Sequence, residues 1–187
     1  MRYNDKGYIE AYWKYGKYPA IHNNIFSLNN LIPADSNVID LGCCFGLLSK
    51  RLSTVYKSVV GIESSETYMK EVIKDPKITY YNMKVDFNTI GSLEDILKKH
   101  KINVVFARRV FPEIVETNGF ELLEKVVQTF FDNGVQYIAI EGRKPSKTAK
   151  NPLYCIQREI EALYPCYKLK YKFKDCALLE RNINEKL

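Results

Sequence analysis

Apolar residues occur along the chain in short runs, and the segments between these runs carry apolar residues every three or four positions. A short apolar run predicts a buried strand, and the wider spacing predicts an amphipathic helix. The five strands predicted in this way lie at 38–41, 58–62, 78–82, 104–107 and 135–140. The predicted helices begin near Phe45, extend over 66–74, reach His100 from a cap at 92–95, and extend over 120–131. This alternation indicates a parallel sheet with right-handed crossovers.

The last part of the chain departs from this alternation. A predicted helix at 153–163 is followed by strands at 166–174 and 176–181, and so short a turn between them makes the two strands antiparallel. The first of these strands predicts one apolar and one basic face, with Tyr167, Leu169, Tyr171 and Phe173 against Lys168, Lys170, Lys172 and Lys174. Lysines protect a sheet edge from pairing with other chains. A nucleic-acid-binding stripe is the alternative interpretation.

Before the first strand, the sequence predicts two helices, around 8–15 and 20–31, that cap the sheet. The predicted fold class is α/β, a single doubly wound domain with a mostly parallel seven-stranded sheet and a C-terminal antiparallel hairpin. A chain of 187 residues is long enough to bury a full core without disulfides or metal. We expect one domain over 1–187, with a helical cap at 1–32 and a core at 33–182.

Composition narrows the class of protein. Hydrophobic residues make up 46% and charged residues 27%, and there is no apolar run of the roughly 18 residues that a membrane span needs. The N-terminal residues contain no apolar signal core, so we expect a soluble cytoplasmic protein with no membrane partner. The net charge of +6 favours anionic partners. Lysine, asparagine, isoleucine and tyrosine all have AT-rich codons, which reduces the weight of that argument.

The cysteines do not suggest a metal or disulfide framework. The chain has five, an odd number without Cys-x-x-Cys spacing, and only two histidines. We therefore expect free thiols in a reducing compartment and no metal site. The five are Cys43, Cys44, Cys155, Cys166 and Cys176.

The junction between the first strand and its helix carries the most specific signal. Gly42 leaves the strand and Gly46 enters the helix, which allows a tight turn and close approach of a ligand to exposed N–H groups. About twenty residues later, the second strand ends in Glu63, whose carboxylate can accept both hydroxyl protons of a ribose. A phosphate-binding P-loop would need Gly-Lys-Ser/Thr, which is absent from this loop. A dinucleotide fold remains an alternative, although its Gly-x-Gly-x-x-Gly is not matched.

The pattern Asp-Leu-Gly-Cys-x-x-Gly, followed by a strand that ends in Gly-Ile-Glu, resembles the first two motifs of the class I S-adenosylmethionine-dependent methyltransferases. Asp40, Gly42 and Gly46 match the usual Asp/Glu-x-Gly-x-Gly-x-Gly, whereas Cys44 stands where the middle glycine is usual. The resemblance covers roughly 33–181. It implies a Rossmann-like domain that uses S-adenosylmethionine and releases S-adenosylhomocysteine.

The resemblance also implies cofactor-binding roles. Asp40 would bind the methionine ammonium, Cys44 and Phe45 would line the methionine arm, and Glu63 would bind the ribose. The remaining cofactor-binding candidates are Asp86 for the adenine amino group, Phe87 for the ring face, and Arg108 for the methionine carboxylate, together with Gly42 and Gly46 of the loop. Alternatively, Asp86 and Phe87 form an Asx-type turn with a core phenylalanine. Arg108 and Arg109 would otherwise bind an anionic substrate or be solvated loop charges.

Methyl transfer from a sulfonium needs positioning and shielding from water more than a catalytic dyad. Glu141 and His22 are candidates for a general base, each with a structural alternative. The acceptor and the oligomeric state cannot be read from the sequence, and an anionic or nucleic-acid acceptor is favoured. The competing hypothesis, raised by Cys44, is a cofactor-binding or interaction protein that kept the fold and lost methyl transfer.

Overall fold

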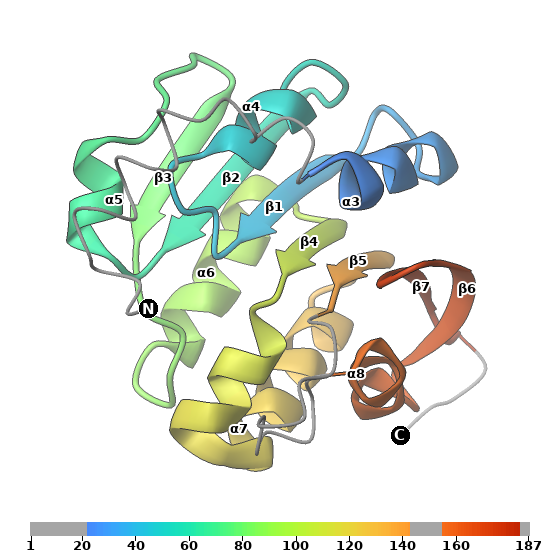
Figure 1. The fold of residues 1–187 in the computed structure, drawn as a ribbon. Helices are drawn as coiled ribbons and strands as arrows, with labels where there is room; N and C mark the ends of the chain where they lie inside the picture. The colour runs from blue at the N-terminus through green and yellow to red at the C-terminus, as the bar shows by residue number, and fades with distance from the viewer. Residues whose placement is uncertain (1–21, 143–154, 184–187) are drawn as a thin grey trace.

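The computed structural model describes residues 22–142 and 155–183. Within these residues, seven strands form one sheet in the order β3-β2-β1-β4-β5-β7-β6 (Figure 1). Strands β1 to β5 are parallel to one another, and β7 is antiparallel to both β5 and β6. The strands are β1 Asn37–Leu41, β2 Ser58–Glu63, β3 Ile78–Asn82, β4 Val104–Arg108, β5 Tyr137–Glu141, β6 Tyr167–Phe173 and β7 Cys176–Arg181. The predicted fold class is confirmed, including the edge position of the sixth strand.

Helices cover both faces of the sheet (Figure 1). One apolar cluster joins α6, α7 and α8 to side chains such as Ile39 and Val105, and the other joins α3 and α4 to side chains such as Val38 and Val104. Successive residues of one strand therefore serve opposite layers, which explains why these strands are continuously apolar. The helical elements are α3 Asn23–Ser27, the 3-10 helix η1 Leu28–Leu31, α4 Leu47–Leu52, α5 Glu66–Lys70, α6 Ile90–His100, α7 Phe111–Asp132 and α8 Ile156–Leu163.

The main departure from the predicted helices concerns α7. We predicted a helix only over 120–131, but α7 begins at Phe111 and changes direction at Gly119, where φ is 79° and ψ is 176°. Pro112 lies in the first turn, where a missing N–H breaks no intrahelical hydrogen bond. The missed first half of α7 is therefore a helical wall directly after β4.

Smaller differences concern the helix ends. Helix α5 stops at Lys70 instead of residue 74, and α6 begins at Ile90, so the predicted cap at 92–95 lies inside the helix. The predicted helix at 20–31 is present as α3 and η1 in its described part, and the one at 8–15 lies outside the described residues. No helix in residues 22–142 or 155–183 is long and apolar enough to span a membrane.

The predicted division of β6 into one apolar and one basic face is wrong. A β-bulge lies between Leu169 and Tyr171, so Leu169 pairs with Leu179 while Tyr171 pairs with its neighbour Leu178. Because successive residues of β7 point to opposite faces, the bulge moves Tyr171 to the face opposite Leu169. The apolar residues of β6 are thus divided between the two faces of the sheet.

Candidate functional site

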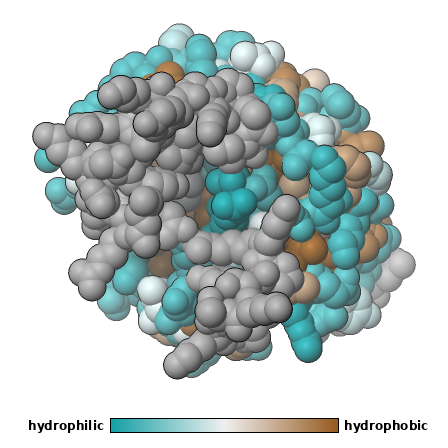
Figure 2. Space-filling view, in the orientation of Figure 1, coloured by the Kyte–Doolittle hydropathy of each residue, from teal (hydrophilic) through white to brown (hydrophobic). Residues whose placement is uncertain are grey.

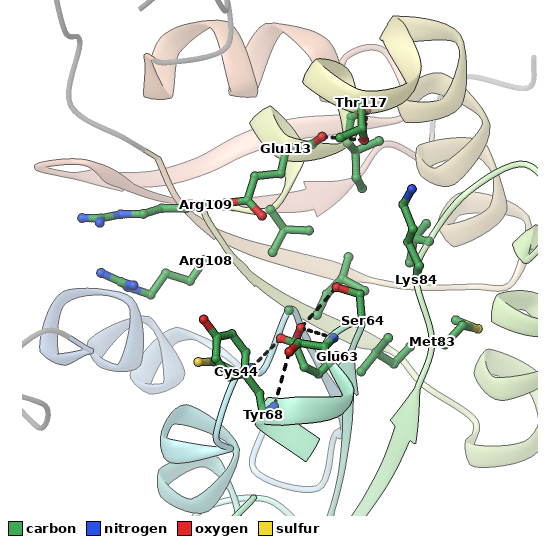
Figure 3. A pocket seen from close by; sticks show the side chains of 17 residues that line it. Cys44, Glu63, Ser64, Tyr68, Met83, Lys84, Arg108, Arg109, Glu113 and Thr117 are labelled. Carbon is green, nitrogen blue, oxygen red and sulfur yellow. Dashed lines mark hydrogen bonds between the residues drawn. The ribbon is translucent and has the colours of Figure 1, made fainter. Parts of the chain in front are cut away.

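A cavity of about 310 Å³ lies at the carboxyl ends of β1, β2 and β4 (Figure 3). Its walls also include the segment after β3 and the first half of α7. The surface near the centre of the face shown in Figure 2 is hydrophilic. The cavity is lined by Leu41, Gly42, Cys44, Ile62, Glu63, Ser64, Ser65, Tyr68, Met83, Lys84, Val85, Arg108, Arg109, Val110, Glu113, Ile114 and Thr117.

The loop after β1 folds back onto the end of β2. The N–H groups of Gly42 and Cys43 both donate to the carbonyl oxygen of Ile62, at 2.8 and 2.9 Å. Gly42 has φ +71°, and a Cβ at that position would lie 2.5 Å from Cγ2 of Val110 on the opposite wall. Gly46 also has a positive φ and begins α4. The predicted tight turn is confirmed, and Gly42 is needed both for its conformation and for the space beside it.

Cys44 also has a positive φ, 53°. A side chain in this left-handed conformation costs about 1 kcal/mol or more, which gives a physical reason for the glycine usual at this position in the family it resembles. Burial, followed by the negative charge of Glu63, raises the pKa of the Cys44 thiol to about 12. The thiol therefore stays protonated at neutral pH and is a poor nucleophile.

Glu63 lies at the cavity wall with its carboxylate held by three donors. The backbone N–H of Cys44 donates to Oε2 at 2.9 Å, the N–H of Ser65 donates to Oε1 at 2.8 Å, and the Ser64 hydroxyl donates to Oε1 at 3.2 Å. The carboxylate is nearly buried and fixed, and its two oxygens can still accept further hydrogen bonds. Ser65 caps α5 by accepting a hydrogen bond from the N–H of Tyr68.

Asp40 and His22 both line a second cavity of about 40 Å³, which Arg108, Cys44 and Phe45 also line. Asp40 is fully buried, and Ser49 donates a 2.6 Å hydrogen bond to its Oδ2. Burial raises the pKa of Asp40 to about 7. Burial, together with the nearby positive charge of Arg108, lowers the pKa of His22 to about 3, so its imidazole is neutral at physiological pH.

The carboxyl end of β4 carries the positive charge of the site. Arg108 lines both cavities, and its Nε donates to Oε1 of Glu141 at 3.0 Å. Arg109 pairs with the same oxygen at 3.5 Å. Burial raises the pKa of Glu141, and the two arginines oppose that shift. Glu141 lines neither cavity, so the structure places this predicted base behind the arginines, where it orients them.

Asp86 and Phe87, predicted to contact the adenine, are not at the cavity. Asp86 accepts a hydrogen bond from the N–H of Asn88 at 3.0 Å, which is an Asx turn, and Phe87 is 44% exposed instead of in the core. Met83, Lys84 and Val85 form the wall there. Phe45 lines the small cavity but not the large one; its ring is fully buried, with its centroid 4.7 Å from that of Tyr68.

One wall of the cavity that the sequence analysis missed is the start of α7. Val110, the N-cap of α7, and Ile114 line the cavity, as do Glu113 and Thr117 (Figure 3). Their helical spacing was visible in the sequence, together with a proline in the position that suits a first turn. The sequence analysis placed no helix before residue 120, so this signal was not used.

Known structures share this architecture, although no family model and no curated protein matches the sequence. A methyltransferase from Anabaena variabilis described as SAM-dependent aligns with a TM-score of 0.67, 15% identity, and coverage of 91% of this chain and 87% of that one. The N-methyltransferase NodS from Bradyrhizobium japonicum aligns with a TM-score of 0.64, 10% identity, and coverage of 87% and 95%. The chain has the class I methyltransferase fold.

A third match extends the comparison to a larger protein. The bifunctional kinase-methyltransferase WbdD aligns with a TM-score of 0.64 and 19% identity over 85% of this chain, which covers only 39% of the WbdD chain. In this methyltransferase fold, ligands are expected in the crevice at the carboxyl ends of the strands. The large cavity, Glu63 and Arg108 all lie at that edge.

Proposed function

We propose that the protein binds S-adenosylmethionine in the large cavity and transfers its methyl group to an acceptor. The observation that carries this proposal is the pairing of a fixed carboxylate, Glu63, with a guanidinium, Arg108, on the wall of one cavity. A carboxylate suits the hydroxyl groups of a ribose, and a guanidinium suits a carboxylate such as that of methionine. The cavity volume of about 310 Å³ lies at the lower end of the range for small-molecule sites.

The residues around the glycine loop also suit the methionine part of the cofactor. Asp40 faces the small cavity beside Gly42 and Arg108, where a carboxylate can stabilise the ammonium group of an amino acid. S-adenosylmethionine supplies an already activated methyl group when bound. The contribution of this chain is then to orient the cofactor and to exclude water, and Tyr68, Val110 and Ile114 form the apolar part of the wall.

His22 is the remaining candidate for proton transfer. Its neutral imidazole can accept a hydrogen bond from an acceptor hydroxyl or amine, but its pKa of about 3 makes it a weak base. Because His22 lines only the small cavity, where we place the ammonium group of the cofactor, we assign it no part in proton transfer. Glu141 acts through Arg108 and Arg109 as a positioning residue.

A second candidate function is a cofactor-binding protein without methyl transfer. Cys44 favours it, because a strained side chain stands at the cavity wall where glycine is usual. Both candidates require cofactor binding, so the binding test comes first.

Calorimetric titration with S-adenosylmethionine and S-adenosylhomocysteine tests the proposal. We expect micromolar binding by the wild type, loss of binding in Glu63→Ala, and retention in Glu66→Ala. The control removes the same charge from an exposed position three residues away. Absence of wild-type binding to both ligands overturns the proposal, and equal affinity in Glu63→Ala and wild type removes Glu63 from the site.

A further inference from the structure

The edge strand β6 leaves large apolar side chains in contact with solvent. Leu169, Tyr171 and Phe173 are 46%, 44% and 41% exposed. Lysines on an edge strand prevent unwanted pairing, but exposed aromatic residues have the opposite effect. The protective interpretation therefore accounts for the lysines of β6 and leaves its aromatic residues unexplained.

The bulge in β6 gathers two aromatic residues and several lysines on one face. Tyr171 and Phe173 pair with Leu178 and Cys176 of β7, which belong to the core layer beneath α3 and α4. Lys168 pairs with Glu180 on the same face, because Glu180 and Leu178 are two residues apart. We call this set the β6 patch: Lys168, Lys170, Tyr171, Phe173 and Lys174.

The charge of the β6 patch is positive. Lys170 donates to Glu180 at 2.8 Å and lies over the ring of Tyr137, so this lysine is compensated. Lys168 faces the same carboxylate, and its positive charge contributes to lowering the pKa of Glu180, while the Lys174 ammonium lies 4.9 Å from the ring centroid of Phe173. The patch thus combines two exposed aromatic rings with three lysines that share one facing carboxylate, Glu180, so its net charge is positive.

We propose that the β6 patch binds single-stranded nucleic acid. Alternate residues of a strand lie roughly 6.7 Å apart, so Tyr171 and Phe173 can each stack on one of two successive, extended bases. Lys168 and Lys174 flank the rings and can contact phosphates. A duplex, whose bases are already stacked, offers the rings no free face. The charge complementarity and the ring spacing together favour a single strand.

The position of the β6 patch links it to the cavity. Phe173 pairs with Cys176, Cys176 pairs with Glu141, and Glu141 pairs with Arg108, so one row crosses the sheet. Three strand spacings make this row roughly 14 Å long. A nucleic-acid strand held on β6 therefore reaches the cavity within a few nucleotides. This step rests on the proposed function: with S-adenosylmethionine bound in the cavity, a nucleotide of that strand is the methyl acceptor.

Fluorescence anisotropy with a labelled uridine 12-mer tests the β6 patch. The double variant Tyr171→Ala/Phe173→Ala should weaken binding about tenfold or more, because two stacking contacts are removed. Lys168→Glu, which leaves the rings in place, should also weaken it. Between 50 and 200 mM salt the wild-type affinity should fall about tenfold, as expected for two or three phosphate contacts.

The opposite face of β6 provides the matched control. Leu169 pairs with Leu179, and Lys172 pairs with Ala177 and donates to Gln157 of α8, so both point away from the patch. The double variant Leu169→Ala/Lys172→Ala should change binding less than about twofold. Thermal unfolding of each variant checks that these exposed substitutions leave the fold intact.

Three outcomes overturn the proposal: no wild-type binding of the 12-mer at 50 mM salt, equal losses from substitutions on both faces, or binding to anionic phospholipid vesicles but not to the 12-mer. Titration of Tyr171→Ala/Phe173→Ala with S-adenosylmethionine separates this result from the proposed function. If this double variant loses 12-mer binding but keeps its affinity for S-adenosylmethionine, the β6 patch is a surface separate from the cofactor site. If the wild type binds the 12-mer but not S-adenosylmethionine, only the cofactor proposal is rejected.

Discussion

Two sides of the large cavity hold their charged groups by different means: the β1–β2 wall, and the β4–β5 wall, by which we mean the end of β4 together with Glu141 of β5 packed behind it. Glu63 is held by the backbone N–H groups of Cys44 and Ser65, with a hydroxyl in addition. Arg108 is held by the side chain of Glu141, which is 33 residues away in the sequence. One wall is thus organised by backbone geometry and the other by a long-range ion pair.

This difference has consequences for robustness. Backbone donors stay in place when side chains change, so the environment of Glu63 depends chiefly on the conformation of the loop. The β4–β5 wall depends on a nearly buried pair, in which removal of one partner leaves an uncompensated charge. Substitutions should therefore affect the two walls to different extents.

The largest effect is expected from Glu141→Ala. The side chain of Arg108 is only 16% exposed, and loss of its carboxylate should lower the free energy of unfolding by about 3 kcal/mol. Affinity for S-adenosylmethionine should fall as well, because Arg108 loses its orientation. Urea denaturation and calorimetric titration measure the two effects.

Glu94→Ala is the control for that substitution, since it removes an exposed carboxylate paired with Lys98 within α6. A pair of this kind contributes about 0.5 kcal/mol or less. Equal unfolding midpoints for Glu141→Ala and Glu94→Ala would show that the β4–β5 wall does not depend on the buried pair.

The sequence predicted the β1–β2 wall better than the β4–β5 wall, and the reason is physical. The turn at Gly42 and the end of β2 at Glu63 depend on residues within one strand-turn-helix unit, so a local pattern defines them. The pairing of Arg108 with Glu141 depends on the register of β4 and β5, which no local pattern states. Glu141 was therefore predicted as a base although it is the partner of two arginines.

The segment after β3 shows the same limit. Asp86 and Phe87 occupy the expected place in the sequence, but Asp86 is engaged in a turn with Asn88 and Phe87 faces solvent. Side-chain direction within a loop depends on a few backbone dihedral angles, and the sequence motif does not fix them. The bulge in β6 is a comparable case, since one extra residue reverses the faces of the residues that follow.

An intermediate effect is expected from pH, at the small cavity where the two walls meet. Asp40 has a folded-state pKa of about 7, above its ordinary 3.8, so the folded state retains a proton that the unfolded state releases. Its contribution to the free energy of unfolding therefore falls as pH rises from about 3.8 to 7. His22 has a folded-state pKa of about 3, below its ordinary 6.5. Its contribution to the free energy of unfolding therefore rises as pH rises from about 3 to 6.5.

Single substitutions separate these opposed contributions. Relative to wild type, Asp40→Asn should gain in the free energy of unfolding as pH rises from 4 to 7, and His22→Gln should lose. Urea denaturation at pH 4.5, 5.5 and 6.5 measures both variants on the same scale. If the free energy of unfolding of both variants depends on pH in the same way as that of wild type, neither group has its predicted pKa shift.

The smallest effect is expected from Cys44→Gly, which tests the backbone-organised wall alone. Relief of the left-handed conformation should raise the free energy of unfolding by about 1 kcal/mol. Lys101 has a similar φ of 50° at the end of α6, away from the cavity, so Lys101→Gly should give a comparable gain without any change in cofactor binding. Comparison of the two variants separates the relief of backbone strain, which both share, from a change in cofactor binding, which only Cys44→Gly can cause.

Titration with S-adenosylmethionine then distinguishes two descriptions of Cys44. If the side chain crowds the cofactor, Cys44→Gly should bind several-fold more tightly than wild type, while Lys101→Gly should not. If the cavity already accommodates the thiol, both variants should bind like wild type. The N–H of residue 44 donates to Glu63 with either side chain, so tighter binding in Cys44→Gly would be attributable to removal of the Cys44 side chain, with the hold on the carboxylate unchanged.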